Sequence, residues 1–584
     1  MSAVMSPMEI MSAAETTPTA GGQITDDAAL WRRLRGVIGE DFRASPIYRT
    51  KLAGPTPGRF RIYPADLSPP NTDRAEALAA RHWRYGQERI VLDPDEMPWG
   101  RIAPSRHFAD RLHRFDWLSH LMSRDDQHDW ARAIVDHWCE EFGRFNPFAW
   151  RIATTADRVW NWLKAGPDLF ETGTEEQVET RRSVLARQVR HLNASLAASP
   201  DALARWRGAA VLVVAAMTYG EGEQRLDESL ARLDMEMTAQ ILPDGGHVSR
   251  SPERLLHALI DVLTVKDLFD RSARSAPDFI DKWIRRMAPM LGFFVAGDGR
   301  LVPFNGGSES RGDLVAAALD KADQPRRNFM FAMKSGFQKL CAGETRVLLD
   351  AGAGPELPFG DFAHAGCLSF DLHDGAARLV TSCGGSRDVS PRWQDSVRST
   401  RAHSSLSLAG LEIGRWETNE ETRLDYLVGP EGIAAKRLEE ETRDVWLEVQ
   451  HGGWRERYGL IHKRRLFLTS DGQRLVGEDT LVRPISQGPA EDLTPVPFEI
   501  RFHLHPDVHP EPAGDAFRLV PKTGLIWRFR TSHGDVRLEK SVYVGRGRLE
   551  ATHQIVLSGR ADPAGDGASP PNCIKWAFLR ERVA

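Results

Sequence analysis

The feature that most constrains the fold is a change in the spacing of apolar residues near residues 324–336. Before this point, apolar residues recur mostly at helical spacing, which is typical of helices that bury one face. After it, short runs alternate between apolar and polar residues and are broken by Asp-Gly, Gly-Gly and Pro turns, which is typical of antiparallel strands. The chain has 584 residues, more than one hydrophobic core usually holds. The sequence therefore predicts an α+β multidomain protein with the helical domain first.

The helical domain is predicted to span residues 27–323, after a disordered tail over residues 1–26. In residues 129–145, one stripe carries Trp130, Ile134 and Trp138, as in a half-buried helix. Similar segments are separated by short stretches with Pro, Gly or Asp, as helix ends require. These segments are residues 173–199, 224–242, 253–269 and 276–294. The succession predicts an array of helix hairpins, interrupted by an irregular segment over residues 54–70.

The β-domain is predicted to span residues 337–584 as an antiparallel sandwich, because many short strands follow one another without helices between them. The strand-like segments are residues 345–352, 367–374, 377–384, 403–410, 444–453, 462–481 and 498–506. Within them, Arg464 and Arg465 alternate with apolar neighbours, and both are interpreted as lying on a solvated strand face.

Composition excludes several classes of protein. With 41% hydrophobic and 27% charged residues, the chain is typical of a globular protein. The formal net charge of −5 does not favour a nucleic-acid-binding protein. The longest apolar run, residues 209–217, is about half of what a transmembrane helix needs. Residues 1–30 do not resemble a secretory signal, which favours a cytoplasmic location. The five cysteines form no Cys-x-x-Cys pair, so a zinc ribbon is not expected.

A first candidate site lies in the segment PDGGHVSRSP, residues 243–252. A Gly-rich turn presents His247 and Arg250 just before a helix that Ser251 can cap and Pro252 can begin. Two interpretations stay open. The turn either exposes both side chains to a ligand, or the glycines only make the turn and His247 is a satisfied loop residue.

A second candidate site combines two histidines that each precede a strand, His364 in GDFAHAGCLSF and His403 in RSTRAHSSLSL. If the two strands are neighbours, the imidazoles can carry protons or bind zinc, because imidazole titrates near neutral pH. The alternative is a pair of unrelated histidines at sheet edges.

Aromatic and polar residues of residues 150–163 are a further candidate surface. The tryptophans Trp150, Trp160 and Trp162 can stack on sugar rings, but their near-helical spacing favours a place in the core. From the same helix, Arg158 and Asn161 can project into a cleft. In the β-domain, His451 precedes a Gly pair and either lines that cleft or only belongs to a hairpin turn.

The order of these segments resembles the heparinase II/III-like family. The resemblance covers the chain from about Trp150 onward and includes WRIATTADRVWNWL, PDGGHVSRSP, AHAGCLSFDL, RLVTSCG, RSTRAHSSLSL, HGGWRERYGLIHKRRLFLTSDGQRLVGEDTL and PFEIRFHLHP. It implies an incomplete α/α helical toroid followed by an antiparallel β-sandwich domain. It also implies β-elimination on an acidic, uronate-containing polysaccharide bound between the two domains, and a periplasmic or cell-envelope location. The sequence leaves the location and the oligomeric state open.

Carried over residue by residue, the resemblance is incomplete. Where active members have a catalytic histidine, this chain has Phe362, while the next family histidine is His364. Of three family metal ligands, two correspond to His364 and His403, but the aspartate corresponds to Ser382, which makes a structural zinc doubtful. The tyrosine of the helical domain falls at Arg254.

The family's Asn-His pair falls near Leu203 and Ala204. The departures have two explanations: the site was rebuilt, or it was lost and the scaffold still binds an acidic glycan. A rebuilt site would use His247, His364 and His403 for proton transfer. Substrate binding would then fall to Arg158, Asn161, Arg250, Arg254 and His451, since Arg pairs well with carboxylates.

Overall fold

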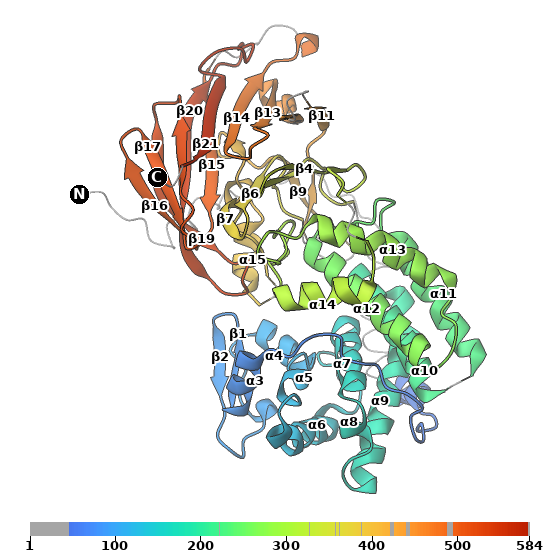
Figure 1. The fold of residues 1–584 in the computed structure, drawn as a ribbon. Helices are drawn as coiled ribbons and strands as arrows, with labels where there is room; N and C mark the ends of the chain where they lie inside the picture. Colours follow the sequence, from blue (N-terminus) through green and yellow to red (C-terminus); the bar gives the residue numbers. More distant parts are fainter. Residues whose placement is uncertain are drawn as a thin grey trace, which may run out of the picture.

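The computed structural model describes residues 46–581, apart from the short segments 221, 326–327, 357, 361–362, 387, 421–424, 440–443 and 488–493. The predicted tail over residues 1–26 and Phe362 lie outside the described residues. In Figure 1 the helices (blue to green) lie below and to the right of a sandwich of strands (yellow to red), with α14 and α15 at the junction. The α+β fold class expected from the sequence is confirmed.

The helical domain consists of helices and one small β-hairpin. Its helices are α2 (Pro46–Leu52), α3 (Thr72–Ala79), α4 (Arg106–His113), α5 (Leu118–Leu121), α6 (His128–Phe142), α7 (Ile152–Ala165), α8 (Pro167–Phe170), α9 (Glu175–Ser195), α10 (Ala202–Tyr219), α11 (Glu223–Gln240), α12 (Pro252–Arg271), α13 (Asp278–Phe293) and α14 (Gly312–Ala322). The hairpin joins β1 (His82–Tyr85) to β2 (Glu88–Val91) and was not expected from the sequence.

Local sequence explains the central helices. The sequence of α10 is apolar on nearly all sides, and the helix is buried almost throughout, as a helix at the centre of a helical domain must be. The Asp201 side chain caps its start by accepting from the backbone N–H of Ala204, and Gly220 ends it in the left-handed conformation. A capping box formed by Thr174 and Gln177 begins α9.

Two antiparallel sheets pack face to face in the β-domain. Their strands are β3 (Phe331–Ala332), β4 (Phe337–Ala342), β5 (Thr345–Asp350), β6 (Phe370–Asp374), β7 (Ala377–Thr381), β8 (Leu406–Leu408), β11 (Ala434–Glu439), β12 (Val445–Trp454), β13 (Leu460–Leu468), β14 (Arg474–Val482), β15 (Val496–Leu504), β16 (Val508–Ala513), β17 (Ala516–Pro521), β18 (Trp527–Thr531), β19 (Val536–Tyr543), β20 (Glu550–Ala561) and β21 (Cys573–Arg580).

One sheet has the order β19-β20-β15-β7-β6-β5-β4-β3, with β8 beside β15, and the other has the order β11-β12-β13-β14-β21-β18-β17-β16. A small hairpin of β9 (Arg415–Thr418) and β10 (Asp425–Val428) and the short helices α15 (Pro391–Val397) and α16 (Arg455–Tyr458) complete the domain. Apolar side chains from both sheets, among them Phe370, Phe502 and Trp576, fill the space between them.

Buried polar contacts join the two domains. Arg250 on the turn before α12 donates to the carbonyls of Ser335 and Ala353, both at 2.8 Å, and forms an ion pair with Asp350 at the end of β5. Glu309 reaches into the β-domain, where it accepts from the Tyr543 hydroxyl at 2.7 Å. Apolar residues of β4 and β5 also belong to the core of the helical domain. The two domains therefore share a continuous interior, and Arg250 is one of the residues that link them.

Within the described part of the chain, no helix combines the length and the apolar character needed to cross a bilayer.

Candidate active-site cleft between the domains

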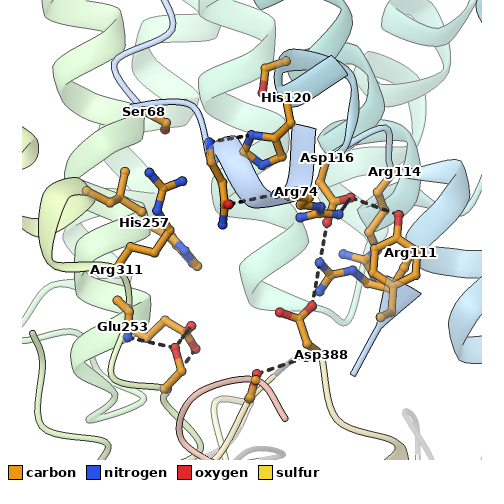
Figure 2. Close-up of a pocket in the computed structure, with 18 of the residues that line it drawn as sticks. Ser68, Arg74, Arg111, Arg114, Asp116, His120, Glu253, His257, Arg311 and Asp388 are labelled. Atoms are coloured by element: carbon orange, nitrogen blue, oxygen red, sulfur yellow. Dashed lines mark hydrogen bonds and ion pairs between the residues drawn. The ribbon is translucent and has the colours of Figure 1, made fainter. Parts of the chain in front are cut away.

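A cavity of about 700 Å³ lies between the helical domain and two loops of the β-domain. We call it the interdomain cleft. Its walls come from α3, β1, α4, α7 and α12, and its floor from Ser386, Asp388 and residues 545–548. Figure 2 shows charged side chains from these segments around an open centre. The arrangement suits a polar ligand that contacts both domains at once.

One wall of the cleft is a network of paired charges. The Asp116 carboxylate accepts from Arg74 at 3.0 Å and from the Tyr85 hydroxyl at 3.2 Å, and it also pairs with Arg111. Burial by itself raises the pKa of Asp116, but the guanidinium groups of Arg111 and Arg74 outweigh burial, so its pKa lies well below the usual range. Asp116 is therefore an anion that orients two arginines toward the cleft.

The opposite wall comes from α12 and the start of α14, where Glu253, His257 and Arg311 face the cleft (Figure 2). Burial lowers the pKa of His257 to about 4, with Glu253 opposing this shift and the nearby arginines Arg207 and Arg254 adding to it. His257 is thus a neutral imidazole at neutral pH, a form that can accept a proton.

Behind this wall the cleft continues into a smaller cavity of about 220 Å³, which we call the deep pocket. Arg207 spans it and forms ion pairs with Asp157 at 3.4 Å and Asp261 at 2.6 Å. Burial raises the pKa of Asp261 to about 7 in spite of Arg207. Five residues line both cavities, namely Arg111, Arg114, Asp157, Arg207 and His257. The two spaces form one connected site.

Three helical-domain positions at which the family resemblance places catalytic side chains lie in this deep pocket. Leu203, Ala204 and Arg254 all line it. Neither Leu nor Ala can transfer a proton, and Arg stays protonated in proteins. The pocket is therefore in the expected place, while those three side chains do not supply the expected chemistry.

His247 also lines the deep pocket, but it is buried and engaged. Its Nδ1 lies 2.8 Å from the Ser249 hydroxyl and its Nε2 lies 3.2 Å from the Gln240 side chain. Burial, with the charge of Arg254, lowers the pKa of His247 to about 3. The interpretation of His247 as a satisfied loop residue fits these contacts.

Two predicted substrate-binding residues lie elsewhere. Arg158 is fully buried and donates to Gln188 at 2.6 Å and to the carbonyls of His113 and Ala149. Its guanidinium therefore links neighbouring helices. Arg250 is fixed at the domain interface, as described above. The expectation that either side chain reaches into the cleft is corrected.

Asn161 does line the cleft, and its amide donates to the Arg114 carbonyl at 3.0 Å. Trp150 and Trp162 are core residues, as their spacing favoured. Trp160 is also almost fully buried but reaches the edge of the cleft, where the guanidinium of Arg207 lies 4.8 Å from its ring centroid.

The strand histidines are neighbours but lie outside both cavities. The rings of His364 and His403 have centroids 5.2 Å apart, and both are buried. Burial lowers the pKa of His403 to about 3 and that of His364 well below 6.5. The third family position is Ser382, whose hydroxyl is a poor zinc ligand. In the described part of the chain, no group of three His, Cys, Asp or Glu side chains is placed to hold a metal. The described residues around His364 and His403 do not fit a zinc site.

His451 belongs to a buried chain of hydrogen bonds inside the sandwich. Its Nδ1 accepts from the Gly453 N–H at 3.1 Å, so its Nε2–H donates to His462 Nδ1 at 3.3 Å. His462 Nε2 in turn donates to Asp479 at 2.7 Å. This chain fixes the tautomers of both imidazoles. The expectation that His451 lines the cleft is corrected.

Arg464 also corrects an expectation, because its side chain is fully buried rather than solvated. Its Nε and Nη2 donate to Asp479 at 2.8 and 3.0 Å. Arg465 points to the opposite face, is half exposed and pairs with Glu448 at 2.6 Å. Only the second of the two arginines lies on a solvated strand face.

Several cleft residues have no motif in the sequence. Arg74, the neighbouring Arg111 and Asp116, and Asp388 come from three separate segments that only the fold brings together. His257 did have a signal. It follows Arg254 by three positions on α12, so the two side chains lie on the same helix face.

Comparisons with known proteins agree with this architecture. A family model described as "Heparinase II/III-like, C-terminal" matches residues 324–577. The chain is 31% identical over 547 residues to "FtsZ-localized protein C" of Caulobacter vibrioides, which covers 91% of this chain and 94% of that protein.

Solved structures share the fold. A crystal structure of heparinase III superposes with a TM-score of 0.66 at 13% identity, covering 96% of this chain and 93% of that one. Heparan sulfate lyase HepC from Pedobacter heparinus gives a TM-score of 0.53 at 15% identity, with 96% and 89% covered. At such identities the likeness shows the fold alone. The family model on the β-domain, the relative over nearly the whole length and the shared polysaccharide-lyase-like scaffold show that the chain belongs to the heparinase II/III-like family.

Proposed function

We propose that the protein binds an acidic polysaccharide in the interdomain cleft without cleaving it by the family's elimination route. The support for binding is the cleft itself, which contacts both domains and presents arginines such as Arg74 and Arg111. Arginine suits carboxylates because its planar fork can donate two parallel hydrogen bonds.

The observation that carries the proposal is the lining of the deep pocket. β-Elimination needs a base for the proton beside the carboxylate and an acid for the leaving oxygen. Leu203, Ala204 and Arg254 stand where the family resemblance places such groups. His247 has both ring nitrogens engaged, and His364 and His403 lie outside the cleft. The retained cleft and the lack of proton-transfer side chains at these family positions together favour binding.

A second candidate is β-elimination by substitute residues, and one observation favours it. His257 is a neutral imidazole at the meeting point of the two cavities, opposite a wall that includes the Tyr85 hydroxyl. An imidazole base and arginines that neutralise a carboxylate are parts of an elimination site. This candidate assigns the base to His257.

We expect saturable glycan binding with no rise in the ultraviolet absorbance of the C4–C5 double bond of an eliminated uronate. The purified protein is incubated with hyaluronan, heparosan and polygalacturonate while absorbance and binding heat are recorded. A rise with any of them would contradict the proposal. A His257→Ala variant that abolished the rise would then support the second candidate, and failure to bind any of the three would reject both.

We also propose that the protein acts where FtsZ assembles, because its relative in Caulobacter vibrioides is named for its localisation with FtsZ and matches over nearly the whole chain. A fluorescent fusion in the native cell is expected to form a band that coincides with labelled FtsZ and disperses when FtsZ is depleted. A fusion spread evenly along the cell while FtsZ rings are present would contradict this expectation.

A further inference from the structure

Arg111 lies where the interdomain cleft meets the deep pocket, and it lines both. It projects from α4, with 11% of its side chain exposed, and contacts two carboxylates. Asp116 belongs to the same helical domain. Asp388 comes from the β-domain loop between β7 and α15, with 41% of its side chain exposed (Figure 2). The Arg111–Asp388 pair therefore bridges the two domains inside the cleft.

The contacts of Arg111 with Asp116 and Asp388 differ in hydrogen-bond geometry. Asp116 accepts a hydrogen bond from Arg111 and is held in place by Arg74 and Tyr85. Asp388 Oδ1 lies 2.9 Å from Arg111 Nη2, but among the described residues it accepts no aligned hydrogen bond. Arg111 Nε is buried and likewise has no acceptor among them. The guanidinium thus keeps a buried donor beside a partner that is close but poorly aligned.

Two other ion pairs of the cleft have buried carboxylates. Arg207 pairs with the buried Asp261 inside the helical domain. Arg546 of the β-domain reaches Glu309, whose side chain is 1% exposed. The carboxylates of both pairs are buried, so neither can exchange its partner by moving into water. Asp388 can move into water, because nearly half of its side chain is already exposed.

We propose that Arg111 is the residue that binds the carboxylate of the glycan, and that Asp388 is a built-in competitor that the glycan displaces. This inference rests on the proposed function and names the group that recognises the ligand. A glycan carboxylate bound to Arg111 replaces the negative charge of Asp388. It also offers an acceptor for the unsatisfied Nε–H. Charge is balanced before and after the exchange.

The exchange also links binding to the contact between the domains. Gly86, at the tip of the β1–β2 hairpin, has a positive φ of 59°, and a Cβ there would lie 2.1 Å from the Asp388 carbonyl oxygen. The hairpin tip therefore packs directly against the backbone of the loop that carries Asp388. When the glycan releases the Asp388 side chain, this loop loses its ion pair to the helical domain.

The test measures the affinity for hyaluronan and heparosan decasaccharides by calorimetry, since both carry one carboxylate per disaccharide. Asp388→Asn removes the competitor and is expected to bind roughly two- to five-fold more tightly, the range of an exposed ion pair. Arg111→Gln removes the recognising group and is expected to bind roughly ten-fold more weakly or worse, as for a lost hydrogen bond to a charged group. In the double variant, the affinity is expected to equal that of Arg111→Gln.

Asp313→Asn is the matched control, because Asp313 pairs with another arginine of the cleft, Arg311, within the helical domain. It is expected to leave the affinity unchanged. The inference is overturned if Asp388→Asn does not tighten binding, or if it tightens binding equally when Arg111 is already Gln, since Asp388 would then act by general repulsion. If neither substitution changes the affinity, this inference alone is overturned. If no variant binds either probe, the proposed function is overturned with it.

Discussion

The Asp479→Ala variant is expected to lose about 3–5 kcal/mol of folding free energy, because it leaves the buried Arg464 guanidinium without a counter-charge. Asp479 is fully buried and accepts from Arg464, from His462 at 2.7 Å and from the Trp576 indole at 2.8 Å. Although burial opposes ionisation, Arg464 and His462 hold the pKa of Asp479 well below its usual range. One substitution thus breaks an ion pair and leaves several buried donors unsatisfied.

Chemical denaturation followed by tryptophan fluorescence measures this loss. The control is Glu478→Ala, one residue earlier on β14, which pairs with the half-exposed Arg465 at 3.0 Å. An exposed pair of this kind is worth about 0–1 kcal/mol. Equal losses in the two variants would show that the buried network around Asp479 is not what stabilises the sandwich.

The second large effect is expected from Arg250→Ala, which removes an ion pair and hydrogen bonds that link the two domains. The variant leaves the buried Asp350 carboxylate without its cation and leaves the Ser335 and Ala353 carbonyls without a donor. Breaking a buried pair in this way costs about 3–5 kcal/mol. Because the lost contacts join the domains, we expect the chain near residues 324–336 to become accessible to protease before either domain unfolds.

Limited proteolysis and thermal unfolding together measure this effect. Arg271→Ala is the control, since Arg271 is 42% exposed and pairs with Asp267 one turn away on α12. Its loss is expected to change stability by about 0–1 kcal/mol and to leave the cleavage pattern unaltered. A wild-type cleavage pattern for Arg250→Ala would contradict a role of this residue in holding the two domains together.

Arg464 and Arg465 show what the alternating sequence pattern can and cannot predict. Alternation along β13 predicts a strand with two different faces, and the structure has such a strand. It does not predict which arginine is buried, because both faces carry basic and apolar residues. Burial of Arg464 depends on Asp479, which β14 places opposite it in the register of the sheet. A charge enters a protein interior only with such a partner.

Arg250 and His257 show the same limit in the site. The Gly-rich turn before α12 allowed an exposed Arg250 that could bind substrate, but the β-domain packs over the turn and the side chain lies in the interface. His257 was overlooked in the middle of a helix, although its spacing from Arg254 indicates the same face. Which helix face lines a cavity depends on the domain that lies opposite.

The sequence by itself determined the two kinds of domain and the approximate extent of their elements, because apolar periodicity and turn residues act locally along the chain. The resemblance to a polysaccharide-lyase scaffold came from the order of motifs such as PDGGHVSRSP and RSTRAHSSLSL. Only the tertiary structure decided which polar side chains meet. Arg111 and Asp388 lie in different domains, and Arg464 and Asp479 lie on different strands, yet each pair is in contact. Such pairings depend on how sheets and helices pack, and packing sums weak contacts over the whole chain rather than over any one segment.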